Sequence, residues 1–121
     1  MGHEFAGVVV SKGNKVTRFQ IGDAVFGTTT LLRAGSQAEY VCIPETWKNG
    51  VVALKPTNLD FKSAAVLPIG AMTALFLLEK AAVQSGQNIL INGASGCVGS
   101  YGVQIANTIG LKMPAMCSGK N

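Results

Sequence analysis

The first half of the chain alternates short apolar runs with polar turns that contain glycine. These runs predict strands at residues 5–10, within 21–27, at 37–43 and at 51–54. Turn residues separate the runs, as in the stretch from Lys12 to Lys15. Short strands joined by glycine turns are typical of a small, strongly bent β-domain.

The pattern changes at Asn58, where helical spacing replaces the short runs. Residues 59–67 predict a short helix with Asp60 as its N-cap, stopped by Pro68. Residues 70–83 predict a longer apolar helix that carries Met72 and Phe76. We expect the Met and Phe side chains of this helix to pack in the core.

A strand, a glycine turn and a helix follow in direct succession. Residues 88–91 are apolar and uncharged, which suits a central strand buried on both faces. Small residues then fill positions 94–99, where a backbone would turn sharply and approach a pyrophosphate at a helix start. The helix would run from Val98 to near Gly110, and residues 112–117 would form a second strand. The order predicts a dinucleotide site, and the alternative is a glycine-rich turn that binds nothing.

Composition narrows the class of protein. The 121 residues match one ordinary domain, but 48% hydrophobic and 13% charged residues fit a chain that normally buries more surface than it can hide alone. We therefore expect a homo-oligomer. The net charge of +4 is spread thinly with no basic run, which argues against nucleic acid as a partner. Three scattered cysteines favour reduced thiols, and no stretch resembles a membrane span or a signal peptide, so we expect a cytoplasmic protein.

Several stretches together resemble successive landmarks of the medium-chain dehydrogenase/reductase superfamily. The match is closest to its zinc-independent branch, the quinone oxidoreductase and zeta-crystallin-like enzymes, and it extends over essentially the whole chain. The stretches that carry it are MGHEFAGVV at 1–9, IGDAVFG at 21–27, AEY at 38–40, KP at 55–56, AAVLP at 64–68, NGASGCVG at 92–99 and VQIA at 103–106.

The resemblance implies a mixed α and β fold, with NADPH bound in the cleft between two domains. Residues 1–66 would be part of a GroES-like catalytic β-domain. Residues 67–121 would be the first βαβ portion of a Rossmann-type parallel sheet, truncated relative to the family. The chain would therefore be an internal fragment of a family member.

The expected cofactor-binding residues lie in three places. The turn contributes Ala94, Ser95, Gly96, Cys97, Val98 and Gly99. An NAD-preferring domain has an acid about 20 residues beyond the glycines, whereas this chain has Ser118 and Lys120, which suit a 2′-phosphate. The alternative for this pair is a solvated tail. Thr73 matches the family position that approaches the nicotinamide, and its alternative is a helix threonine bonded to its own backbone.

Zinc is not expected. His3 matches a zinc ligand of the zinc-dependent relatives, but a second ligand position falls near Ile69, which cannot coordinate a metal. The loop with four closely spaced cysteines that many zinc relatives carry is also missing, since no cysteine occurs between Gly27 and Tyr40. His3 and Glu4 would then be polar residues near the old catalytic cleft.

The leading functional hypothesis is an NADPH-dependent oxidoreductase that transfers hydride to a quinone, an enone or a similar small carbonyl substrate. No residue of the chain is assigned as a general acid, and we expect these 121 residues to be inactive alone. Three alternatives stay open: a truncated, non-catalytic product that folds by self-association, an enoyl-thioester reductase, and, disfavoured by the missing ligands, a zinc-dependent alcohol dehydrogenase.

Overall fold

The computed structural model describes residues 1–29, 34–46 and 50–119 of the chain. It divides into two compact units, Met1–Pro68 and Ile69–Asn121, and each is described by itself. The assignment of residues 1–66 and 67–121 to two family domains stays a prediction. In the part of the chain that is described, no helix has the length and apolar character needed to cross a membrane.

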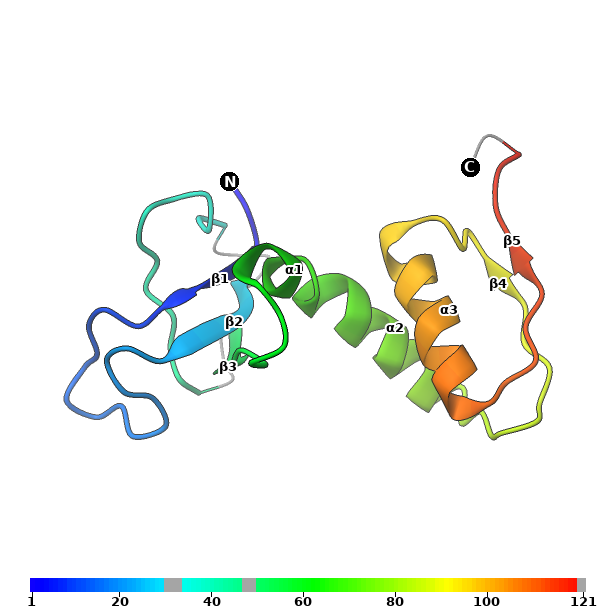
Figure 1. Ribbon diagram of the computed structural model, residues 1–121, viewed down its shortest axis with the longest axis horizontal. Helices are drawn as coiled ribbons and strands as arrows, with labels where there is room; N and C mark the ends of the chain where they lie inside the picture. The colour runs from blue at the N-terminus through cyan, green and yellow to red at the C-terminus, as the bar shows by residue number, and fades with distance from the viewer. Residues whose placement is uncertain (30–33, 47–49, 120–121) are drawn as a thin grey trace. The chain divides into compact units, whose positions relative to one another are not determined.

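The first unit is built on a three-stranded antiparallel sheet with the strand order β1-β2-β3 (Figure 1). Its strands are β1 (Glu4–Val8), β2 (Ala24–Thr29) and β3 (Gly50–Leu54). Gly27 sits at the centre of the register, opposite Phe5 on one side and Val52 on the other. The strands predicted at residues 5–10, 21–27 and 51–54 are thus confirmed, with shifted ends.

The core of the first unit lies between the sheet and a short helix. In β2 every second residue is buried, and Val25 joins Phe19 and Ala64 in the core. The helix α1 (Phe61–Ala65) packs on β1 and β2 through Ala64, which is fully buried. The predicted helix at residues 59–67 is therefore confirmed, although it is shorter.

Asp60 caps α1 as predicted. Its carboxylate accepts a hydrogen bond from the Ser63 backbone amide at 2.6 Å, and Asp60 itself has an extended backbone. The backbone hydrogen bond from Ser63 holds the pKa of Asp60 below its ordinary value, helped by the Ser63 hydroxyl and by the positive charge of Lys55.

This cap gives the first unit an acid-dependent contribution to stability. Because the pKa is lower in the folded chain than in the unfolded chain, the contribution is complete above the unfolded pKa and is lost as the pH falls through the folded pKa. We expect Asp60→Ala to lower the melting temperature at neutral pH. Asp60→Asn, which can still cap, should change it little there and should remove part of the loss seen on acidification to about pH 2. Thermal unfolding followed by circular dichroism measures these melting temperatures. If Asp60→Asn lost as much stability on acidification as wild type does, the acid-dependent contribution would not come from Asp60.

The strand predicted at residues 37–43 is wrong. Within the described residues, the segment from Ala38 to Ile43 makes no backbone hydrogen bond, and Tyr40 is 74% exposed. Alternating apolar residues make a segment extended, but a strand also needs a partner at hydrogen-bonding distance. Here a groove separates the segment from β1, so the ladder does not form.

The helix predicted at residues 70–83 is observed as α2 (Pro68–Lys80). Pro68 begins this helix, where its missing amide costs nothing. The expectation that its Met and Phe stripe packs in the core is wrong, because Met72, Leu75, Phe76 and Leu77 are all exposed, Phe76 by 55%. The described residues therefore cover only about half of each of these side chains.

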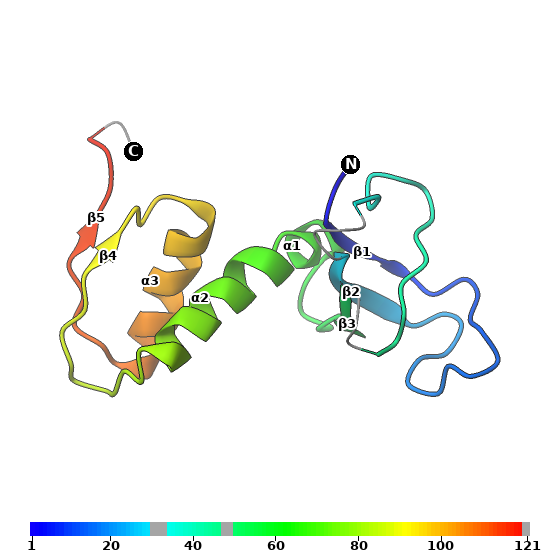
Figure 2. The same ribbon diagram turned by 180° about the vertical axis from the view of Figure 1, so that it is seen from behind.

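The second unit also holds a strand, a turn and a helix (Figure 2). β4 (Ile91–Asn92) pairs in parallel with β5 (Ala115–Met116), and an isolated bridge joins Asn88 to Lys112. Between them α3 (Cys97–Ile109) packs against β4 and ends at Gly110, which adopts the left-handed conformation with φ +82°. The predicted helix end near Gly110 is confirmed.

The strand predicted at residues 88–91 pairs as expected but is not buried on both faces. Parallel hydrogen bonds join Ile89 to Lys112 and Ile91 to Pro114, although only Ile91–Asn92 form a regular strand, and Leu90 is 61% exposed. In the described chain β4 has a single neighbour strand and a single packed helix, so one face remains open. The parallel pairing expected for residues 112–117 is confirmed over Ala115–Met116.

Candidate functional site

The turn between β4 and α3 is held in a tight conformation by its backbone. Gly93 has φ +79°, which favours glycine, and the amides of Gly93 and Ala94 both donate to the Met116 carbonyl at 3.0 and 2.9 Å. The Gly96 amide donates back to the Gly93 carbonyl at 2.9 Å. The turn is therefore fixed to the end of β5 as well as to β4.

The start of α3 has free hydrogen-bond donors. Gly96 is the N-cap and has no side chain to cap the helix. Within the described residues, the amides of Cys97 and Val98 have no backbone acceptor, as expected in a first helical turn. The positive end of the helix dipole adds to these donors. The arrangement can bind an anionic group such as a phosphate.

Gly99 makes the close approach of helix and turn possible. A Cβ atom at this position would lie 2.1 Å from the Gly93 carbonyl oxygen and 2.8 Å from the Ala94 Cα. Both neighbours are backbone atoms that cannot move away without opening the turn. Only glycine fits here, as predicted from the pattern.

The sequence that contains the turn is free of acidic residues that would repel an anion. No Asp or Glu occurs after Glu79. Ser118 follows β5 at the end where the glycine turn begins, because Met116 accepts the hydrogen bonds of the turn. The carboxyl ends of parallel strands are where such sheets bind ligands.

The structure brings together some of the predicted cofactor-binding residues but not all of them. Ala94, Ser95, Gly96, Cys97, Val98 and Gly99 lie together in the turn and the first turn of α3. Thr73 is exposed on α2 and belongs to the same unit, three residues after Gly70, which contacts the region of Cys97. Lys120 lies outside the described residues. Their roles in cofactor binding stay predictions.

Gly70 was missed by the sequence reasoning. A Cβ atom on Gly70 would lie 2.6 Å from Cys97 Sγ and 2.7 Å from the Tyr101 ring, so α2 and α3 approach closely at this point. The available signal was the pair of small residues Gly70 and Ala74, spaced one helical turn apart on one side of the helix.

The residues around His3 do not fit a zinc site. The His3 Nδ1 is buried and has no hydrogen-bond partner among the described residues, while its carbonyl accepts from the Thr29 amide and the Thr28 hydroxyl, both at 2.7 Å. Across the same residues, no group of three or more His, Cys, Asp or Glu side chains could hold a metal ion. A catalytic zinc needs three protein ligands, so we derive no metal chemistry here.

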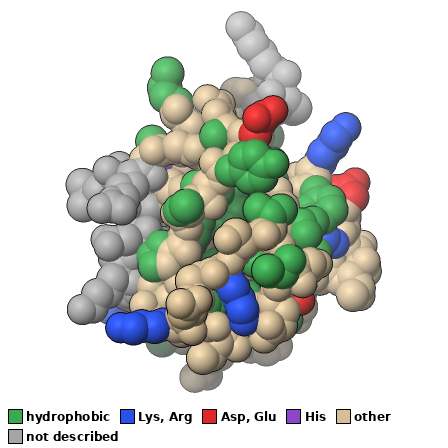
Figure 3. Space-filling view, turned by 90° about the vertical axis from the view of Figure 1, so that its left-hand side faces the viewer, with side chains coloured by type: hydrophobic (Ala, Val, Ile, Leu, Met, Phe, Trp, Pro, Cys, Tyr) green, Lys and Arg blue, Asp and Glu red, His purple; other side chains and the backbone are tan. Residues whose placement is uncertain are grey.

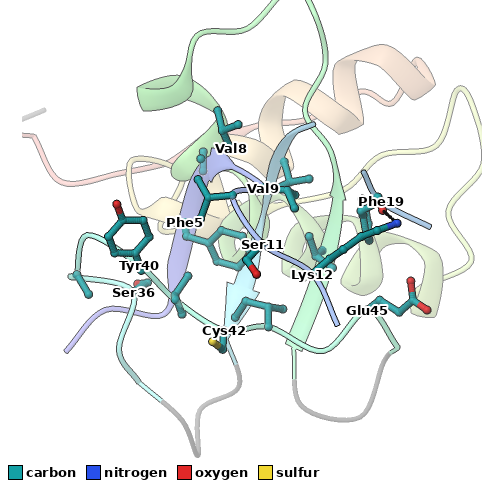
Figure 4. A pocket seen from close by; sticks show the side chains of 18 of the residues that line it. Phe5, Val8, Val9, Ser11, Lys12, Phe19, Ser36, Tyr40, Cys42 and Glu45 are labelled. Carbon is teal, nitrogen blue, oxygen red and sulfur yellow. Dashed lines mark hydrogen bonds between the residues drawn. The ribbon is translucent and has the colours of Figure 1, made fainter. Parts of the chain in front are cut away.

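The first unit has a groove of about 750 Å³ between β1 and the extended segment of residues 36–45. Apolar side chains gather on this face of the unit (Figure 3), and Phe5, Val8, Val9, Tyr40 and Cys42 line the groove (Figure 4). Two of its charged side chains, Lys12 and Glu45, already have partners within the chain. Lys12 Nζ donates to the carbonyls of Val16 and Phe19 and to Gln20, and the Glu45 carboxylate accepts from the amides of Thr17 and Arg18. The groove therefore offers apolar surface and few free polar groups.

Comparison with known proteins agrees with this architecture. The family described as the alcohol dehydrogenase GroES-like domain matches residues 1–56. Over 113 residues the chain is 42% identical to the quinone oxidoreductase of Sus scrofa, a match that covers 93% of this chain and 32% of that protein. It is also 41% identical over 114 residues to the 2-methylene-furan-3-one reductase of Solanum lycopersicum, covering 89% and 28% of the two chains.

Solved structures match over nearly the whole chain. The quinone oxidoreductase from Coxiella burnetii superposes with a TM-score of 0.89 and 33% identity, covering 100% of this chain and 37% of that one. The chain belongs to the medium-chain dehydrogenase/reductase superfamily. It falls in the quinone oxidoreductase-like branch of that superfamily. It spans about a third of the length of the relatives that it matches.

Two further solved structures are similar to the chain. The CurK enoyl reductase superposes with a TM-score of 0.76 and 31% identity, covering 98% of this chain and 34% of that chain. A mycobacterial protein in complex with NADPH superposes with a TM-score of 0.82 and 25% identity, covering 98% and 36%.

Proposed function

We propose that the protein to which these residues belong transfers hydride from NADPH to a quinone, an enone or a similar small carbonyl substrate. The observation that carries the proposal is the Gly93–Gly99 turn, which closes so tightly on α3 that only glycine fits at Gly99. Beside it, the amides of Cys97 and Val98 have no backbone acceptor among the described residues and could bind phosphate oxygens. The similar proteins are named as a reductase and as quinone oxidoreductases, which supports an oxidoreductase activity.

NADPH is favoured over NADH by the residues beyond β5. Residues 117–121 include no acid that could bind a ribose 2′-hydroxyl, and Ser118 has a hydroxyl that can donate to a 2′-phosphate. Lys120, which lies outside the described residues, would add a positive charge. The superposed NADPH complex supports the same choice.

The chain's own residues would bind and orient the cofactor. NADPH, when bound, supplies the hydride. The amides at the start of α3 would hold the pyrophosphate, Ser118 would contact the 2′-phosphate, and Thr73 would lie toward the nicotinamide. No described residue is assigned a proton-transfer role. The turn would thus form one wall of the cofactor site, and other parts of a full-length family member would form its other walls.

Two alternatives have specific support. The similarity to CurK favours an enoyl-thioester reductase, which would use the same cofactor site on a different substrate. The exposed apolar side chains of α2 favour a non-catalytic chain that self-associates to cover them. In both the catalytic and the self-associating case we expect a homo-oligomer, and a cytoplasmic location remains our expectation.

Sedimentation velocity combined with NADPH and NADH titrations separates these possibilities. We expect the 121-residue chain to bind NADPH more tightly than NADH and to show no turnover of a quinone by loss of NADPH absorbance. An oligomer that binds neither nucleotide would overturn the cofactor proposal and support self-association. A monomer that reduces the quinone would overturn the expectation that these residues are inactive alone.

A further inference from the structure

α2 meets α3 at Gly70, and small residues of α2 are among its buried ones. Gly70 is buried, and Ala74, one turn later, is only 2% exposed, whereas the bulky Met72 and Phe76 of the same helix are exposed. The helix therefore turns its small residues inward in the second unit and its large ones outward. Small residues at a helix contact allow the two backbones to approach closely.

Gly70 contacts the start of the helix that carries the glycine turn. A Cβ atom built on it would lie 2.6 Å from Cys97 Sγ, 2.7 Å from Tyr101 Cε2 and 2.8 Å from Tyr101 Cδ2. Real Cβ atoms essentially never come within 3.0 Å of such neighbours, so an alanine here requires movement. Tyr101 has a further interaction of its own, so its ring is not free to move aside at no cost.

We propose that Gly70 is a positioning residue, which seats α2 against Cys97 and Tyr101 and thereby sets where Thr73 lies relative to the phosphate-binding turn. This inference rests on the proposed function. Thr73 follows Gly70 by three residues, so a displacement of α2 at Gly70 moves the Thr73 backbone with it. The turn itself is held separately, by its hydrogen bonds to Met116 and by Gly99.

The same geometry couples Gly70 to Cys97. The Cys97 thiol lies where a side chain on residue 70 would extend, so the lack of a side chain on Gly70 makes room for the thiol. An added methyl group at residue 70 should therefore be tolerated better when Sγ is removed. Because the Tyr101 ring stays in place, the relief should be partial.

The experiment compares ligands that contain and lack the nicotinamide. Wild type and Gly70→Ala, both as the full 121-residue chain, are titrated with NADPH and with adenosine 2′,5′-bisphosphate, which keeps the adenine half and its phosphates. We expect Gly70→Ala to weaken NADPH binding about tenfold, the size of an ordinary overpacking cost, and to change bisphosphate binding less than about twofold. An equal loss for both ligands, or no loss for NADPH, would overturn the inference.

Two further variants make the result specific. Gly102→Ala is the matched control, since Gly102 is also a buried helix glycine but its added Cβ would meet nothing closer than Ile91 Cδ1 at 3.7 Å. It should leave both affinities within about twofold. In the double-mutant cycle, adding Gly70→Ala to Cys97→Ala should destabilise the chain less than adding it to wild type, and additive effects would contradict the coupling.

The outcomes distinguish this inference from the proposed function. If the wild-type chain binds neither ligand, the cofactor proposal fails, and the positioning role of Gly70 fails with it. The unfolding cycle would still report whether Gly70 and Cys97 are coupled. If the wild-type chain binds both ligands and Gly70→Ala binds them as wild type does, only the positioning role fails.

Discussion

Gly99→Ala is expected to abolish NADPH binding and to lower the free energy of unfolding of the second unit by about 2–3 kcal/mol. The new Cβ would lie 2.1 Å from the Gly93 carbonyl oxygen, so either the turn opens or α3 moves off it. Opening the turn would also break the bond from the Gly96 amide to the Gly93 carbonyl and misalign the amides of Cys97 and Val98. Isothermal titration with NADPH and denaturant unfolding measure the two effects.

The control for Gly99→Ala lies in the same helix. Gly102→Ala adds the same methyl group one turn later, where the nearest neighbour would be at 3.7 Å. It should retain NADPH binding and cost much less stability, because alanine also favours the helix more than glycine does. If Gly99→Ala binds NADPH as wild type does, the turn is not the phosphate site.

Gly27→Ala is expected to have the largest effect on the first unit. A Cβ atom at Gly27 would lie 2.0 Å from the Val51 carbonyl oxygen and 3.0 Å from the Phe5 ring. Since Gly27 is opposite Phe5 in β1 and Val52 in β3, the methyl group would force apart the middle of the sheet. We expect a loss of about 3 kcal/mol or more, which is a large part of the stability of a small domain. Denaturant unfolding followed by far-ultraviolet circular dichroism measures this loss of unfolding free energy.

Gly7→Ala is the matched control for Gly27→Ala. Gly7 is also a strand glycine, in β1 and opposite Val25, but an added Cβ would meet nothing within 4 Å. The substitution should change the free energy of unfolding by less than about 1 kcal/mol. Similar losses in the two variants would mean that the β2–β3 register is not as described.

Local signals predicted the parts of the fold that depend on neighbours in sequence. Asp60 caps α1 and Gly110 ends α3, because a cap and a left-handed end are decided within a few residues. The order of strand, glycine turn and helix is also local, and Gly99 was recognised from it as the position of close packing. These features place the candidate site on the correct elements.

Features that depend on distant neighbours could not be predicted in the same way. The segment from Ala38 to Ile43 has the alternation of a strand, but alternation does not supply the partner that a ladder requires. The apolar pattern of α2 likewise does not say whether anything covers Met72 and Phe76. Gly70 and Gly27 became informative only when the structure showed which atoms their missing side chains would meet.

The central claim is that the Gly93–Gly99 turn binds the phosphates of NADPH. A titration of the ¹⁵N-labelled 121-residue chain with NADPH, followed by amide chemical shifts, tests it residue by residue. We expect the shifts to change at Cys97, Val98 and Gly99 and at Ser118, and to change less with NADH. Saturating NADPH that leaves these amides unchanged, or that changes only residues of the first unit, would contradict the account.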